Sequence, residues 1–530
     1  MPYDSKDRTG ISCEDAGASP DVSAETNTRA IQEALNGGGL VTLTKPGTYR
    51  VTADSFTVGS DTKVQIGPGV VFSIAGSATR LSSLAPYTQK TEFVRSSKRP
   101  NSVLLVGDSI TSNNITTTAA SSYYNTIGCF TWANAYMNQR LDITANVGVG
   151  GMSAGTYQAN SLRTNITGYL STYDTAYVAC LIGTNDITSD RTSAQLIADL
   201  DYIFKVCVDA GRVVLTSTIL PRLSGGSGLT AAQRNVLMAV NAWIRERNMR
   251  TDGVLVSDPF RYAADPASAT SDPFANETYD SSTVGLHPAP AMAMRVGKIW
   301  AADWGTYIPL TRRLVGGAGD LYDATDNVYG NLATNGTLQT IGATSGTGFA
   351  GNNPTGYTIQ RVTGAGTWTG SAVARTDGVP GNWYQAAIAL ESNASAQYQM
   401  RHNIFGPSGG GTNTYAIGDQ LFAEAELSIT HTGSTNYVKS VHVTATEYDR
   451  DGNVVYVVGA PYRYSGTNPL QRAEDYSIIA RTPTFTSIGS AGAGEASQRV
   501  TLSVDVLFDG SVSAGLTIKM GQVSLRKVVA

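Results

Sequence analysis

Charged residues are scarce in this sequence. Lys, Arg, Asp and Glu make up 15% of its 530 residues, against about 25% in an average soluble protein. The formal net charge is −4 at pH 7, so the chain has no cationic surplus of the kind that binds nucleic acid or an anionic membrane. We therefore expect neither of these as a partner.

Cysteines and long apolar runs are also few. The four cysteines, Cys13, Cys129, Cys180 and Cys207, form no C-x-x-C or Cys/His pattern, so no disulfide framework and no metal site are expected. Two of them, Cys180 and Cys207, lie in apolar runs that are typical of buried segments. No apolar run reaches the roughly eighteen residues of a membrane span, and the polar N-terminus has no secretory signal. We expect no membrane insertion.

Glycine and tyrosine, by contrast, are abundant, with 56 and 26 residues, and the N-terminal part shows how glycine is used. Residues 1–92 contain one helical segment, TNTRAIQEAL, followed by short β-type pieces separated by glycines. This pattern indicates one or two coils of a β-solenoid. Because a solenoid needs about three stacked repeats to bury a core, this segment is expected to lean on a neighbour or on other copies of itself.

The pattern changes to α/β alternation in residues 93–310. Five apolar strands alternate with helix-length periodic segments, at residues 103–106, 143–147, 176–182, 213–219 and 254–257. Such alternation predicts a parallel sheet covered by helices on both faces. One helix opens with a capping box, Thr230 and Gln233, and another ends at Gly211.

Helical periodicity disappears in residues 311–530. Short alternating strands separated by turn signals predict an all-β sandwich. The segment DRDGNVVY has some features of a calcium loop, but an Asp-Gly pair between strands favours a hairpin turn.

One strand of the α/β part leads directly into a candidate nucleophile. In SVLLVGDSIT, Ser109 follows the apolar residues 103–106 and a glycine. A serine hydroxyl needs a base to remove its proton, and at neutral pH this base is most often histidine. His287 is the one histidine of the α/β segment, because the other three, His402, His431 and His442, lie in the C-terminal part.

Two glycine-rich turns can supply donors for an oxyanion. Residues 146–153 have the spacing N-x-G-x-x-G-x-S, and GTND follows another strand at residues 183–186. Loops that leave the carboxyl ends of parallel strands meet at one edge of the sheet, where ligands bind. Ser109, Gly151, Asn185 and His287 are therefore expected to meet there.

In their order along the chain, GDSI, NVGVGGMS, GTND and LHP resemble the four sequence blocks of the SGNH (GDSL-like) hydrolases. The resemblance covers residues 100–305 and implies a three-layer α/β/α fold with a flavodoxin-like sheet. It further implies a serine esterase in which Ser109 is the nucleophile and His287 the general base. The oxyanion hole is assigned by resemblance to the backbone N–H groups of Ser109 and Gly151 and to the Asn185 side chain.

Two points remain open in this assignment. GMSAG, residues 151–155, also fits the G-x-S-x-G elbow of α/β-hydrolases with Ser153 as nucleophile, although only one α/β strand precedes the run that leads to it. The family places the acid that orients the histidine three residues before it, where this chain has Val284. Asp280 is our candidate for that acid. The alternative is a Ser–His dyad whose ring is held by a backbone carbonyl near Ser282 or Val284.

The flanking segments suggest a biological context. The N-terminal run from DAGASPDVSAETNTRAIQEAL onward resembles the opening of bacteriophage tailspikes, whose solenoids are homotrimers, and the C-terminal part is similar to a jelly-roll carbohydrate-binding module. Together these resemblances imply a tailspike of the phage virion that acts outside the host cell and removes O-acetyl groups from a bacterial surface polysaccharide, without cofactor or metal. A catalytically silent adhesin and a secreted lipase or acylhydrolase are the alternatives.

Overall fold

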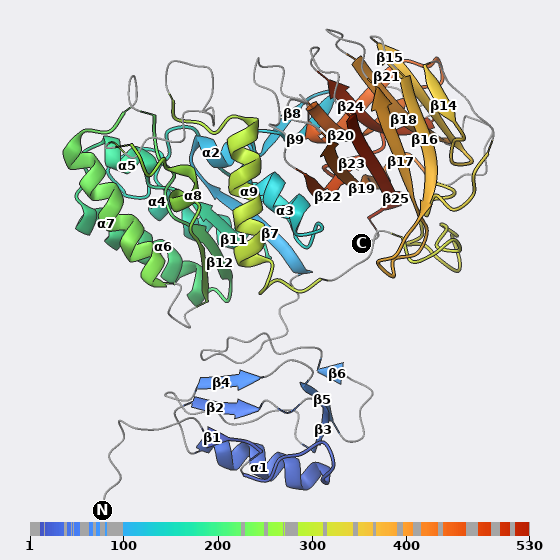
Figure 1. The fold of residues 1–530 in the computed structure, drawn as a ribbon. Helices are drawn as coiled ribbons and strands as arrows, with labels where there is room; N and C mark the ends of the chain where they lie inside the picture. The colour runs from blue at the N-terminus through green and yellow to red at the C-terminus, as the bar shows by residue number, and fades with distance from the viewer. Residues whose placement is uncertain are drawn as a thin grey trace, which may run out of the picture.

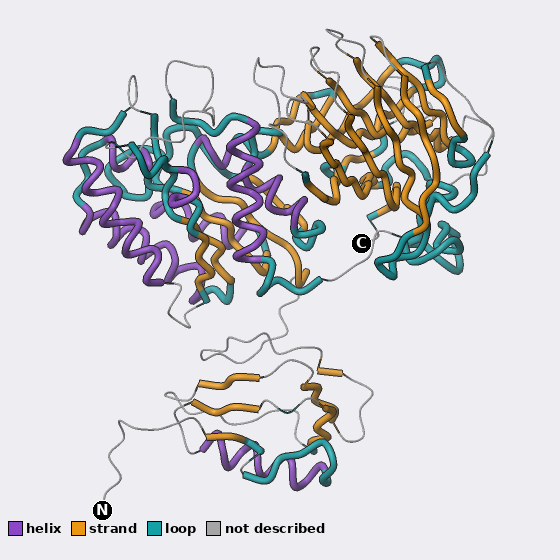
Figure 2. The backbone as a smooth tube through the Cα atoms, viewed as in Figure 1, coloured by secondary structure: helices purple, strands orange, loops and turns teal. Residues whose placement is uncertain are grey.

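The protein is described here by a computed structural model (Figures 1 and 2). The described residues are 11–14, 16–36, 40–43, 45, 47–52, 63–66, 70–74, 80–81, 99–223, 228–247, 253–268, 270, 285–310, 315–342, 348–363, 367–389, 396–405, 415–432, 438–462, 475–488, 499–508 and 515–528.

The α/β region contains a five-stranded parallel sheet (Figure 1). Its strands are β7 (Arg99–Gly107), β10 (Asp142–Asn146), β11 (Thr175–Leu181), β12 (Val213–Ser217) and β13 (Val254–Ser257). They lie in the order β10-β7-β11-β12-β13, and every pair is parallel. This is the 2-1-3-4-5 order of flavodoxin-like folds, in which the strand order reverses beside the first strand. The predicted parallel sheet is thus confirmed.

Helices cover both faces of this sheet, because its strands are apolar on both sides. Along β7, Val103 and Leu105 belong to one buried cluster, and Leu104 and Val106 to another. The first cluster includes α3 (Cys129–Tyr136) and α9 (Pro290–Trp304); the second includes α4 (Leu162–Thr172), α6 (Ser193–Asp209) and α7 (Ala231–Arg247). The described part of the region also contains three short helices, α2 (Ser109–Ser112), α5 (Thr184–Thr188) and α8 (Phe260–Ala263).

The helix ends follow the capping chemistry read from the sequence. Thr230 and Gln233 exchange the two hydrogen bonds of a capping box at the start of α7, at 3.0 and 3.2 Å. After α6 the backbone of Gly211 has φ +74°, a left-handed conformation that ends the helix. The four cysteines are buried and free.

The C-terminal region is all-β, as predicted. One seven-stranded sheet contains β14 (Phe349–Gly351), β16 (Thr367–Ala374), β17 (Asn382–Ala389), β25 (Gly515–Lys527), β19 (Gln420–Thr432), β22 (Tyr476–Arg481) and β23 (Phe485–Thr486). The other contains β15 (Tyr357–Thr363), β18 (Ala396–Phe405), β24 (Arg499–Phe508), β20 (Val438–Tyr448) and β21 (Val454–Tyr462), together with two strands from the α/β region. The inward side chains of both sheets belong to one buried cluster. In DRDGNVVY, residues 449–453 form the turn between the antiparallel strands β20 and β21, and VVY begins β21.

The two added strands were not anticipated from the sequence. β8 (Ile115–Thr118) and β9 (Ser121–Asn125) form a hairpin that follows α2, and β9 pairs in parallel with β21, more than 300 residues later in the chain. Figure 1 shows this hairpin between the α/β region and the C-terminal strands. The segment that follows the candidate nucleophile therefore belongs to the C-terminal sheet.

The described residues of the N-terminal region form α1 (Ala24–Asn36) and six short strands: β1 (Ile11–Ser12), β2 (Leu40–Leu43), β3 (Gly47–Val51), β4 (Lys63–Ile66), β5 (Val70–Ile74) and β6 (Arg80–Leu81). β2 pairs with β4 and β3 with β5, both in parallel. The domain boundaries expected at residues 92 and 310 stay predictions. Among the described helices, none combines the length and the apolar character that a membrane span requires.

Candidate active site

Four of the sequence-predicted residues lie in segments that meet at the carboxyl edge of the parallel sheet. Ser109 begins α2 directly after β7, Asn185 lies in α5 after β11, and Gly151 lies in the turn after β10. His287 precedes α9. β7 and β11 are neighbours on either side of the point where the strand order reverses, which is where ligands bind in such sheets.

The structure brings Ser109 and His287 into hydrogen-bond contact. The distance between Ser109 Oγ and His287 Nε2 is 2.8 Å, although the two residues are 178 positions apart. Both side chains are half-buried, so a substrate can reach them. This is the distance expected between a nucleophile and the base that takes its proton.

The local backbone around Ser109 depends on Gly107 and Asp108. A Cβ at Gly107 would lie 2.2 Å from Leu181 O, so only glycine allows β7 and β11 to approach this closely. The Asp108 carboxylate then caps α2 by accepting from Ile110 N at 2.9 Å. Burial raises the pKa of Asp108 to about 7.

Gly151 lies in a tight turn. Met152 N donates to Val149 O at 3.0 Å, and Gly151, at the third position of this turn, has φ +76°. A type II turn requires such a left-handed residue there, which explains the glycine. Hydrogen bonds among the described residues use neither the Gly151 N–H nor the Ser109 N–H, so both are available to a substrate oxygen.

The Asn185 amide is oriented toward the same turn. Its Nδ2 donates to Met152 O at 2.9 Å, and because an amide nitrogen carries two hydrogens, one N–H is left for a ligand. The neighbouring Asp186 accepts from Ala154 N at 2.9 Å and Gly155 N at 3.1 Å. Burial raises the pKa of Asp186. The aspartate therefore braces the turn that carries Gly151.

Ser153 is in a different environment. Its side chain is fully buried, and its Oγ donates to Gly155 O at 2.7 Å and to Asn160 O at 3.3 Å. Among the described residues no histidine contacts it. The geometry thus favours Ser109 over Ser153 as the nucleophile.

Arg222 is a site-supporting residue that the sequence analysis missed. It is buried in the loop after β12 and donates from Nε to Thr184 Oγ1 at 2.8 Å and from Nη2 to Thr184 O at 3.0 Å. These bonds fix the residue that precedes Asn185. No short motif surrounds Arg222, so only the predicted convergence of strand ends could have pointed to it.

The third member of a triad cannot be read from the described part of the chain. Asp280, Ser282 and Val284 all lie outside the described residues. Asp280 as the orienting acid, and the dyad as its alternative, both stay predictions.

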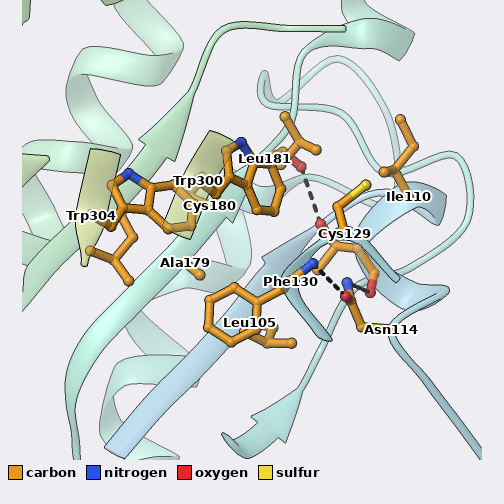
Figure 3. A pocket seen from close by; sticks show the side chains of 12 residues that line it. Leu105, Ile110, Asn114, Cys129, Phe130, Ala179, Cys180, Leu181, Trp300 and Trp304 are labelled. Carbon is orange, nitrogen blue, oxygen red and sulfur yellow. Dashed lines mark hydrogen bonds between the residues drawn. The ribbon is translucent and has the colours of Figure 1, made fainter. Parts of the chain in front are cut away.

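A small cavity lies in the core beside α2 (Figure 3). Its volume is about 10 Å³, and its lining includes Ile110, Thr111, Trp300 and Trp304 but neither Ser109 nor His287. This is space for roughly one water molecule. The cavity therefore does not hold a substrate. Among the described residues, no three His, Cys, Asp or Glu side chains gather as metal ligands would.

Comparison with known proteins gives a family for part of the chain. Residues 105–294 match the GDSL-like Lipase/Acylhydrolase family, and no curated protein matches the chain. The similar solved structures include a putative lipolytic protein of the G-D-S-L family from Desulfitobacterium hafniense, at 13% identity and a TM-score of 0.29, which covers 38% of this chain and 98% of its own.

Two further solved structures are similar over a comparable share of the chain. A putative acylhydrolase from Bacteroides fragilis has 16% identity and a TM-score of 0.30, and covers 40% of this chain and 90% of its own. A putative platelet activating factor from Streptococcus pneumonia has 20% identity and a TM-score of 0.29, and covers 39% of this chain and 84% of its own. The family match and the site geometry together support a GDSL-like hydrolase domain within residues 105–294.

Proposed function

We propose that the protein is a serine esterase that removes O-acetyl groups from a bacterial surface polysaccharide, as the tailspike or receptor-binding component of a phage virion. The observation that carries the esterase is the 2.8 Å contact between Ser109 Oγ and His287 Nε2, beside unused donors at Ser109 N and Gly151 N.

In the first half-reaction, His287 Nε2 takes the proton of Ser109 while Oγ attacks the acetyl carbonyl carbon. The carbonyl oxygen becomes negative and accepts from Ser109 N–H, Gly151 N–H and the second N–H of Asn185 Nδ2. Each such donor is worth about 10²–10³ in turnover. The bond to the sugar oxygen then breaks, and His287 returns the proton to that oxygen, which leaves acetyl-Ser109.

In the second half-reaction, His287 deprotonates a water molecule, and the resulting hydroxide attacks the acetyl carbon. The same donors stabilise the second oxyanion. Breakdown releases acetate and returns the proton from His287 to Ser109 Oγ. No step draws on a cofactor or a metal.

The flanking regions support the polysaccharide part of the proposal. The parallel pairs β2–β4 and β3–β5 of the N-terminal region fit two coils of a solenoid that trimerises. The all-β region is proposed to be a jelly-roll glycan-binding module. Only 15% of the residues are charged, and many side chains carry hydroxyl groups. Such a composition can offer hydrogen bonds to the hydroxyl groups of a glycan.

A lipase or acylhydrolase is a second candidate because of two apolar side chains on the loops of the site. Val149, in the turn that carries Gly151, is 36% exposed, and Leu223, whose N–H donates to Gly285 O two residues before His287, is 42% exposed. Such side chains can contact an acyl chain. The polysaccharide esterase is preferred because of the flanking regions.

The test compares acetate release from an O-acetylated capsule or O-antigen with hydrolysis of a short-chain ester and of a long-chain lipid ester. We expect the wild type to release acetate, and we expect the rate of release to fall about 10³-fold or more in Ser109→Ala. Ser153→Ala, checked for folding, should still release acetate because Ser109 is intact. A preference for long acyl chains would support the lipase. Strong glycan binding without any acetate release would support the adhesin.

A further inference from the structure

One row of side chains crosses all seven strands of the sheet that contains β8 and β9. Each residue of the row pairs with the residue on the neighbouring strand. From β15 through β18, β24, β20, β21 and β9 to β8, the residues are Thr358, Arg401, Ser503, Thr444, Gly459, Tyr123 and Thr116. We call this set the cross-sheet row. Residues that pair directly lie on the same face of a sheet.

The cross-sheet row faces away from the hydrophobic core. The residues that alternate with it along the central strands, such as Leu502, Val504 and Val443, are buried in the core cluster. Because successive side chains of a strand point to opposite faces, the row lies on the outer face. On this face of β24, Ser503 and Asp505 are each only 3% exposed, so neighbouring side chains cover them.

The side chains on this face include hydroxyl, amide and carboxylate groups that hydrogen-bond one another. Asp505 accepts from Gln397 Nε2 at 3.1 Å, from Gln399 Nε2 at 3.0 Å and from Ser503 Oγ at 2.8 Å. Ser503 Oγ also contacts Thr444 Oγ1 at 2.5 Å. These groups hold one another in place, as expected for a surface that presents hydrogen-bonding groups to a polyhydroxylated ligand.

Arg401 differs from Arg375 and Arg481, two other arginines of the C-terminal region, in its hydrogen-bond partners. Arg375 and Arg481 each have carboxylate partners, but no described residue accepts a hydrogen bond from Arg401, and its Nε atom is buried without a partner. The Asp505 carboxylate, two residues along β24 from the residue that pairs with Arg401, accepts three hydrogen bonds and has His442 Nε2 3.9 Å away. A half-buried guanidinium that has no partner among the described residues can take an external anion, best a carboxylate or phosphate that it can bind with two hydrogen bonds.

At the other end of the row, Tyr123 provides an aromatic surface. A Cβ at Gly459 would lie 3.1 Å from Tyr123 Cδ1, so the absence of a side chain at Gly459 lets the ring lie against β21. Tyr123 is half-buried. Beyond it, Thr116 is exposed on β8, the strand that follows α2 and Ser109.

We propose that the cross-sheet row is a binding track for an acidic polysaccharide, in which Arg401 pairs with a sugar carboxylate and the chain continues over Tyr123 toward the strand next to Ser109. The proposal deepens and rests on the esterase function proposed above. Six strand spacings of about 4.8 Å give a row roughly 29 Å long, which suits an extended chain rather than a single sugar.

The experiment measures binding by calorimetry in the Ser109→Ala background, so that no ligand is consumed. The probes are fragments of polygalacturonate, alginate and hyaluronate, each beside the same fragment with its carboxylates reduced to alcohols. Arg401→Gln removes the charge, and Thr358→Asp gives Arg401 a carboxylate partner on the facing strand. Thr358→Asn is the uncharged match, and Arg50→Gln removes an exposed positive charge from the N-terminal region.

We expect at least one acidic fragment to bind about tenfold or more tightly than its reduced form, with binding weakened by salt. Arg401→Gln and Thr358→Asp should each lose about that factor, while Thr358→Asn and Arg50→Gln should not. Melting temperatures establish that each variant is folded.

The proposal is overturned if no acidic fragment is preferred to its reduced form, or if folded Arg401→Gln binds as tightly as its parent. Failure of the esterase function has a different signature, because it appears as wild-type protein that releases no acetate, whatever the binding result.

Discussion

The N-terminal and all-β regions differ in how their cores are built. Among the residues whose burial the structure describes, the buried cluster of the N-terminal region consists of residues between 13 and 51. The α/β and all-β regions instead share one cluster, which includes Trp132 from α3, Trp368 from β16 and Val504 from β24. Two changes in sequence pattern therefore differ physically. Within the described residues, the change near residue 92 separates two buried clusters, and the change near residue 310 falls within one shared cluster.

Polar contacts and strand pairing reinforce the shared core. Gln139 Nε2 donates to Ile479 O at 2.6 Å, Arg481 pairs with Asp142, and the rings of Trp132 and Tyr476 pack edge to face with centroids 6.4 Å apart. The hairpin of β8 and β9 completes the C-terminal sheet. Because this hairpin begins three residues after the helix of Ser109, the all-β region also supports the candidate active site.

The largest expected effect comes from Trp132→Ala. Trp132 is fully buried between the two regions, and its Nε1 donates to Thr126 O at 2.8 Å. We expect the free energy of unfolding to fall by about 3–5 kcal/mol, with the α/β and all-β regions unfolding together. Denaturant unfolding followed by tryptophan fluorescence measures this, because all six tryptophans lie at or after residue 132.

The matched control is Tyr49→Ala, which removes a fully buried aromatic side chain from the N-terminal cluster. It should leave the tryptophan-detected transition in place. An equal shift in Tyr49→Ala, or two separate tryptophan transitions in the wild type, would contradict the comparison.

An intermediate effect is expected for the pH dependence of stability in Asp108→Asn. Burial raises the pKa of Asp108 from 3.8 to about 7, so between these values the folded state holds a proton that the unfolded state has lost. Stability therefore falls as pH rises through this window, by up to about 1.4 kcal/mol per pH unit. Asparagine still caps α2, and its introduction should remove this part of the slope.

Urea unfolding between pH 4.5 and 7.5 measures the Asp108 effect. If the two regions unfold as one unit, reporters in both α7 and β16 will show the same change of slope. If the free energy of unfolding of Asp108→Asn depends on pH as it does in the wild type, the Asp108 carboxyl group is not the cause of that dependence.

The smallest effect is expected for Asp142→Asn, which removes the carboxylate that pairs with Arg481 between the α/β and all-β regions. The Asp142 side chain is 38% exposed, and Arg481 keeps Glu424 at 3.5 Å and the ring of Phe422 at 4.0 Å. The loss should stay below about 1 kcal/mol. A loss as large as that of Trp132→Ala would mean that the ion pair, and not apolar packing, holds the two regions together.

Local patterns predicted the α/β region well. Apolar strands, the capping box at Thr230 and the glycine at 211 each specify structure over a few residues, and the structure has the corresponding elements. Because parallel strands end at one edge of a sheet, the sequence also predicted that Ser109 and His287 would meet. The structure places Ser109 Oγ 2.8 Å from His287 Nε2.

The contact between the α/β and all-β regions could not be predicted in this way. Residues 115–125, ITTTAASSYYN, have the composition of a polar loop, and the partner of β9 is a strand more than 300 residues away. Such pairing depends on tertiary packing, which local propensity does not encode. The support of Asn185 by Arg222 was missed for the same reason, since a single arginine in a loop carries no pattern.

The central claim, that His287 activates Ser109 as a nucleophile, is tested most directly by labelling with a fluorophosphonate, which attaches covalently to an activated serine. We predict one label per chain, located by peptide mapping at Ser109, and a labelling rate at least about a hundredfold lower in His287→Gln. Labelling at Ser153, or at an unchanged rate in folded His287→Gln, would contradict the account.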